Sequence, residues 1–150
     1  MATEVQNYEG ALDKGLEGVV ACTTSVSSII ENTLNFRGYT IEDLSQNASF
    51  EEVVYLLWND KLPNKSELTT FRADLDKEMK LDPAYVQVLK GIPTKVHPMA
   101  WLRTAVSLLA HWDVDANDNS HAANLRKSLK LTAKMSSIVC AYDAIRNGKD

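Results

Sequence analysis

The chain has 150 residues, of which 45% are hydrophobic and 24% are charged, and its formal net charge is −4. This length and composition fit one soluble globular domain that would bury about two-thirds of its unfolded surface. The mildly acidic balance supplies no basic patch for a phosphate backbone, which argues against a nucleic-acid partner.

The N-terminal residues 1–13 are polar and acidic, without the basic and apolar regions of a signal peptide. No apolar run approaches the roughly 18 residues of a membrane span. The two cysteines, Cys22 and Cys140, form no C-x-x-C pair, as is typical of reduced thiols in a cytosolic protein. These features predict a cytoplasmic protein without a membrane partner.

The first predicted elements are β-strands. β-branched residues recur over 19–23 and 25–30, and Glu31-Asn32 is suited to turn the chain toward 33–36. We therefore expect a small antiparallel hairpin or ribbon in this part of the chain.

Nearly everything after Tyr39 is predicted to be helical. Ser49 and Glu52 have the spacing of a capping box, while Thr40 and Asn64 begin imperfect versions of the same pattern. Pro83 and Pro98 stand at plausible first helical positions. The predicted helices span residues 40–46, 49–60, 65–79, 83–91, 98–112 and about 120–147.

The last two predicted helices have unusual surfaces. Residues 98–112 are apolar around most of the helix, a pattern typical of burial in a large protein or against a partner. The final helix would be about 40 Å long. Its second half repeats small residues that let another helix approach closely, which favours helix–helix assembly; they are Ala133, Ser137, Ala141 and Ala144.

No complete active site or metal site is predicted. The loop 113–118 begins like a calcium-binding loop, but Asp118 stands where that loop needs glycine, so a solvated connection is the preferred interpretation. His97, His111 and His121 have no helical zinc spacing and are assigned structural roles. Arg37 is expected to anchor its turn by stacking or by bridging to a carboxylate.

Three motifs carry a resemblance to a known family. The block Asn35–Leu68 contains F-R-G-Y, then S-F-E-E-V-V-Y-L-L, then L-P; residues 96–107 read V-H-P-M-A-W-L-R-T-A-V-S; and residues 133–139 read A-K-M-S-S-I-V. In this order and spacing they resemble the citrate synthase family. One departure is Ser136, where the family usually has proline.

The resemblance implies a mainly α fold, with a small N-terminal antiparallel β-hairpin, in which a large and a small domain close over oxaloacetate and acetyl-CoA. The family's catalytic His and Asp motifs do not occur in these residues. Residues 1–150 are thus expected to be the N-terminal part of the large domain, without the small domain and catalytic segments, and inactive alone. No tightly bound cofactor is implied, because acetyl-CoA is a substrate.

Two further implications concern partners and ligands. Residues 98–112 and 120–147 resemble the helices of the family's homodimer interface. Lys14 matches a basic residue that in some members reaches the phosphate of CoA; its alternative interpretation is a plain solvated lysine. Two other functions stay open, namely a 2-methylcitrate synthase that uses propionyl-CoA and a non-catalytic helical dimerisation module of the same fold.

Overall fold

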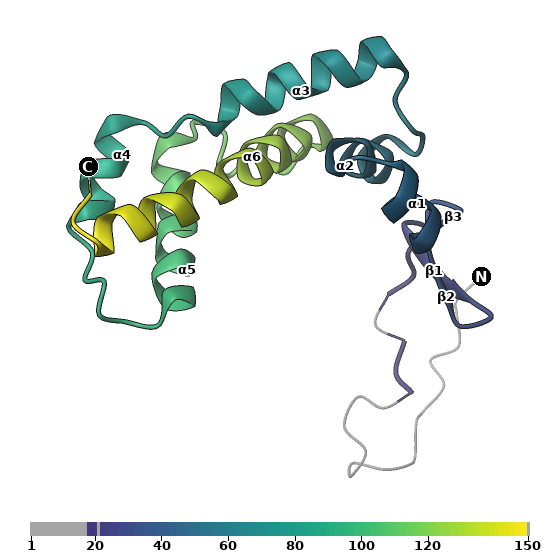
Figure 1. The fold of residues 1–150 in the computed structure, drawn as a ribbon, viewed down its shortest axis with the longest axis horizontal. Coiled ribbons are helices and arrows are strands. Elements are labelled where there is room, and N and C mark those ends of the chain that lie inside the picture. Colours follow the sequence, from purple (N-terminus) through teal and green to yellow (C-terminus); the bar gives the residue numbers. More distant parts are fainter. Residues whose placement is uncertain (1–17, 21, 150) are drawn as a thin grey trace, which may run out of the picture.

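A computed structural model of the chain describes residues 18–20 and 22–149. The expected mainly helical fold with a small antiparallel sheet is confirmed (Figure 1). Its elements in chain order are β1 (Ser27–Ile30), β2 (Thr33–Phe36), β3 (Tyr39–Thr40), α1 (Ile41–Asn47), α2 (Phe50–Asn59), α3 (Lys65–Met79), α4 (Pro83–Lys90), α5 (Pro98–Leu108), the 3₁₀ helix η1 (Leu109–Trp112) and α6 (His121–Arg146).

The sheet is antiparallel, with β2 between β1 and β3. The predicted turn between β1 and β2 is confirmed, and both its residues have positive φ, 49° at Glu31 and 65° at Asn32. The F-R-G-Y motif forms a second turn of this kind, with φ of 48° at Arg37 and 87° at Gly38. Two positive φ values match the right-handed twist of hairpin strands, and glycine adopts them without steric cost.

The strand predicted over 19–23 is wrong for residues 19, 20, 22 and 23, the part of it that the structure describes. β-branched residues favour a strand only where a neighbouring strand receives their backbone hydrogen bonds. Here β1 pairs with all four residues of β2, and β3 pairs with Asn35 and Phe36 on the other edge of β2. Residues 19, 20, 22 and 23 receive no strand partner.

Side-chain caps fix the helix starts close to their predicted positions. The carboxylate of Glu52 accepts a hydrogen bond from the Ser49 backbone N–H at 2.8 Å, while the Ser49 hydroxyl accepts one from the Glu52 N–H. Bonds from the Ser49 backbone and hydroxyl lower the pKa of Glu52. Asn64 and Glu67 form an equally reciprocal box, more complete than predicted. The predicted helix 98–112 divides into α5 and η1, since 3₁₀ turns often end helices.

Arg37 joins the sheet to α2. Its guanidinium donates to the Ser25 hydroxyl at 3.0 Å and to the Leu57 carbonyl at 3.3 Å. It also forms an ion pair of 2.6 Å with Asp60, the left-handed residue that ends α2. The expected bridge from Arg37 to a carboxylate is therefore confirmed.

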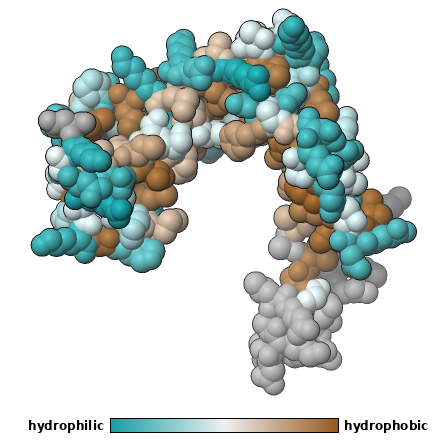
Figure 2. Space-filling model, in the orientation of Figure 1, coloured by the Kyte–Doolittle hydropathy of each residue, from teal (hydrophilic) through white to brown (hydrophobic). Residues whose placement is uncertain are grey.

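The elements form an open arch (Figure 1). The sheet, α1 and α2 stand at one end, α4 and α5 stand at the other, and α3 with α6 connects them. A buried hydrophobic cluster lies at the α4–α5 end and consists of Tyr85, Leu89, Trp101, Ala105 and Ile138. Figure 2 shows apolar side chains on both limbs of the arch, facing the hollow between them. No helix of the described part of the chain is both long and apolar enough to cross a membrane.

Candidate functional site

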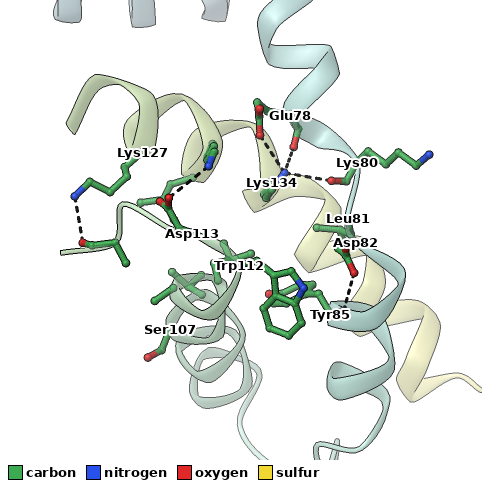
Figure 3. A pocket seen from close by; sticks show the side chains of 16 residues that line it. Glu78, Lys80, Leu81, Asp82, Tyr85, Ser107, Trp112, Asp113, Lys127 and Lys134 are labelled. Atoms are coloured by element: carbon green, nitrogen blue, oxygen red, sulfur yellow. Dashed lines mark hydrogen bonds and ion pairs between the residues drawn. The ribbon is translucent and has the colours of Figure 1, made fainter. Parts of the chain in front are cut away.

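A cavity of about 610 Å³ opens between the end of α3, α4, the end of α5 and α6 (Figure 3). Leu81, Tyr85, Leu109, Trp112 and Leu131 give it a largely apolar wall. The wall also contains charged residues of both signs, which are Glu78, Lys80, Asp82, Asp113, Lys127, Lys130 and Lys134. The electrostatic potential inside this cavity depends on which of these charged side chains are paired with a neighbouring group.

Lys134 is neutralised at the end of α3. Its ammonium group donates to the backbone carbonyls of Glu78 and Lys80, the second at 3.2 Å, and lies 3.4 Å from the Glu78 carboxylate. Carbonyls in the last turn of a helix have no partner within the helix, and a cation there also complements the helix dipole. Lys134 therefore caps α3 from a helix 56 residues further along the chain.

The other two lysines of α6 hold the loop between η1 and α6. Lys127 donates to the carbonyls of Ala116 and Asp118, and Lys130 lies 3.6 Å from the Asp113 carboxylate. Arg126 forms an ion pair with Asp115 in the same loop. These acids therefore serve as partners for cations, in agreement with the interpretation of this loop as a connection. No group of His, Cys, Asp and Glu in the described residues has the arrangement of a metal site.

Tyr85 forms the buried floor between this cavity and the core. Its side chain is 1% exposed, and its hydroxyl donates to the Ala105 carbonyl at 2.7 Å. Its ring meets the Trp112 ring edge-on, with centroids 5.4 Å apart. Burial disfavours the phenolate and raises the pKa of Tyr85 to about 12.

This burial predicts a loss of stability at high pH. The unfolded chain releases the Tyr85 proton near pH 10, whereas the folded chain keeps it to about pH 12, so stability falls across this window. The expected loss is roughly 2–3 kcal/mol. Urea unfolding at pH 9–12 should show a shallower decline for Tyr85→Phe than for the parent chain. If the free energy of unfolding declined equally in the two proteins, Tyr85 would not be the group whose raised pKa causes the loss.

The predicted assembly surfaces are partly used within the chain itself. On α5, Trp101 and Ala105 are buried in the core, while Met99 is 62% exposed. On α6, the small residue Ala133 is buried. The exposed apolar residues of α6 follow a different line along the helix, with four-residue spacing: Leu131, Met135 and Val139. We call this line the α6 ridge.

The other predicted residues do not come together as a site. His97 caps α5 by accepting a hydrogen bond from the Met99 backbone N–H, and His121 begins α6. The ring of His111 contacts that of Trp112 edge-on. Lys14, the predicted contact to CoA, lies outside the described residues.

The cavity itself was not predicted from the sequence. One available signal was the spacing of Lys127, Lys130 and Lys134, which places three cations along one side of a long helix. Their partners lie in the preceding loop and at the end of α3, and the sequence pattern does not identify such distant carbonyls.

The fold and the cavity together define a class of protein: a mainly helical unit with open apolar surfaces. In its described residues, no group of side chains is arranged as a catalytic site. Comparison with known proteins is more specific. The family model described as citrate synthase, C-terminal domain, matches residues 15–150. The chain belongs to the citrate synthase family.

Individual relatives agree with this assignment. Citrate synthase 2 of Bacillus subtilis is 49% identical over 136 residues, which cover 90% of this chain and 37% of that protein. 2-Methylcitrate synthase 1 of Corynebacterium glutamicum is 37% identical, with coverage of 91% and 36%. The crystal structure of citrate synthase from Pyrobaculum aerophilum matches with a TM-score of 0.80 and 33% identity, covering 91% of this chain and 37% of that one. The chain thus spans little more than a third of the length of these relatives.

Proposed function

We propose that this chain forms the N-terminal part of the large domain of a citrate synthase, a cytoplasmic acyltransferase that condenses acetyl-CoA with oxaloacetate to give citrate and CoA. The observation that carries the proposal is the 49% identity to Citrate synthase 2 of Bacillus subtilis across 90% of the chain. Its N-terminal placement rests on the order of the sequence motifs, because the matching family model is itself described as a C-terminal domain.

In this proposal the described residues provide scaffold and not chemistry. None of the described histidines is part of a group that has the arrangement of a metal site, and His97 is engaged as a helix cap. Acetyl-CoA is a substrate, and no tightly bound cofactor is required. Lys14 is retained as the candidate contact to the phosphate of CoA.

Homodimer formation through residues 98–112 and 120–147 is part of the same proposal. The exposed α6 ridge and the exposed Met99 of α5 support it, since apolar surface left in water favours association. Light scattering of the complete enzyme should give twice the mass of one chain.

A transplant tests the proposed activity. Residues 15–150 would replace the matching stretch of Citrate synthase 2 of Bacillus subtilis, and release of CoA from acetyl-CoA and oxaloacetate would be measured. We expect activity from the chimera and none from residues 1–150 alone, because the catalytic motifs of the family lie outside them. Activity of residues 1–150 alone, or a folded but inactive chimera, would contradict the proposal.

A 2-methylcitrate synthase is a second candidate, because a relative with that name is 37% identical to the chain. The complete protein would then turn over propionyl-CoA faster than acetyl-CoA. A non-catalytic dimerisation module is the third candidate, and it requires that residues 1–150 form a stable dimer without any synthase activity in the complete protein.

A further inference from the structure

The two residues that follow α6 form a peptide bond with unusual access. Asn147 ends α6, and Gly148 follows it with φ of 66°. Asn147 is the only asparagine of the sequence that precedes a glycine. Both residues are exposed, and a Cβ at Gly148 would meet no atom of a non-neighbouring described residue within 4 Å. Water therefore reaches this bond, and no side chain shields the Gly148 nitrogen.

The end of α6 holds the two neighbouring groups in hydrogen bonds. The Gly148 N–H donates to the Ile145 carbonyl at 3.1 Å, a bond typical of a helix that ends in a left-handed glycine. The side-chain amide of Asn147 donates to the Asp143 carbonyl at 2.8 Å and to the Asp143 carboxylate at 3.3 Å. The Gly148 nitrogen can therefore attack the Asn147 side chain only when this last turn opens, as exposed helix ends do.

We propose that Asn147 is a site of spontaneous deamidation, and that opening of the α6 end sets its rate. The Gly148 backbone nitrogen gives its proton to water and bonds to Cγ of Asn147, whose amino group takes up a proton and leaves as ammonia. Water then opens the resulting cyclic imide at either of its carbonyls, which leaves aspartate or isoaspartate. Water is consumed and ammonia is released, so the reaction needs no enzyme and no cofactor. It is independent of the proposed function.

The product would weaken the helix end that controls the reaction. A carboxylate at residue 147 has no N–H to donate to Asp143, and it adds negative charge beside the Asp143 carboxylate. It also stands at the negative end of the helix dipole. In the same part of α6, Tyr142 and Ile145 pack against the buried cluster at the α4–α5 end. Deamidation is therefore expected to loosen α6 where it meets the core.

Mass spectrometry of the aged protein tests the proposal. The complete chain would be kept folded at mildly alkaline pH, and conversion of Asn147 would be followed in the peptide that carries it. Asn124 is the matched control, because it is also an exposed residue of α6 with a hydrogen-bonded side-chain amide, but leucine follows it. We expect Asn147 to convert about tenfold faster than Asn124, and about tenfold more slowly than in a free peptide of residues 143–149.

Two results would overturn the proposal. Conversion of Asn147 no faster than that of Asn124 would show that the residue is not a deamidation site. Conversion as fast as in the free peptide would show that the end of α6 does not control the reaction.

Hydrogen exchange tests the consequence for the helix. Asn147→Asp reproduces the charge of the product, and Asn147→Gln keeps a neutral amide as its control. The backbone amides of residues 145–149 are expected to exchange about two- to fivefold faster in Asn147→Asp than in Asn147→Gln. Both variants leave the buried cluster unchanged, so each is expected to fold. Equal exchange in the two variants would overturn the link between deamidation and the end of α6.

Discussion

Replacing Trp101 by alanine is expected to lower the free energy of unfolding of this chain by about 3–5 kcal/mol. Trp101 is 1% exposed and is the largest of the fully buried side chains. Its ring packs on Tyr142, with centroids 4.9 Å apart, and joins α5 to α6. Because so few described residues are buried, few neighbours can close the space that the indole leaves. Urea unfolding followed by circular dichroism would measure the change.

Two other variants separate this packing effect from effects on α5 itself. Met99→Ala lies on the same helix but is 62% exposed, so its expected change is within about 0.5 kcal/mol. Trp101→Phe should cost less than Trp101→Ala, because phenylalanine fills much of the space and removes a buried indole N–H that has no acceptor. Equal destabilisation by Met99→Ala and Trp101→Ala would contradict the central position of Trp101.

Replacing Arg37 by methionine is expected to cost about 2–3 kcal/mol. The change keeps much of the aliphatic stem but removes the charged donor that connects Ser25, Leu57 and Asp60. The side chain of Arg37 is only 18% exposed, so water replaces these bonds poorly. Thermal unfolding would give the change in stability, and hydrogen exchange would show whether β1 and β2 lose protection before α2 does.

Asp60→Asn is the matched control for Arg37. The side chain of Asp60 is 69% exposed, and asparagine tolerates the left-handed backbone of this residue, where φ is 62°. An exposed ion pair contributes at most about 1 kcal/mol. If Asp60→Asn lowered the free energy of unfolding as much as Arg37→Met does, the stabilisation would come from the ion pair and not from the hydrogen bonds to Ser25 and Leu57.

The features that could be predicted from the sequence are those that depend on residues close together in the chain. The starts of α2 and α3 follow from Ser49 and Asn64, since a cap and its partner lie three residues apart. The strand predicted over 19–23 is wrong at residues 19, 20, 22 and 23, because a strand needs a pairing partner that a local pattern of β-branched residues does not supply. The apolar character of 98–112 was correctly noted, but part of that surface serves the core of the chain itself.

The cavity was beyond such local reasoning. It depends on the packing of the end of α3 and of α4 and α5 against α6, elements that are far apart in the sequence. Lys134 illustrates this, because its role is defined by carbonyls 54 and 56 residues away. The family resemblance identified the correct fold but did not indicate the presence of this cavity.

The cap that Lys134 places on α3 also sets an order of events during synthesis on the ribosome. The end of α3 is made 56 residues before its cap. At about 5–20 residues per second, the interval is on the order of 3–11 seconds. During this interval the last carbonyls of α3 must rely on water, so the end of that helix is expected to fray in the nascent chain. The arch can close only once α6 has emerged from the ribosome, because α6 carries the cap of α3.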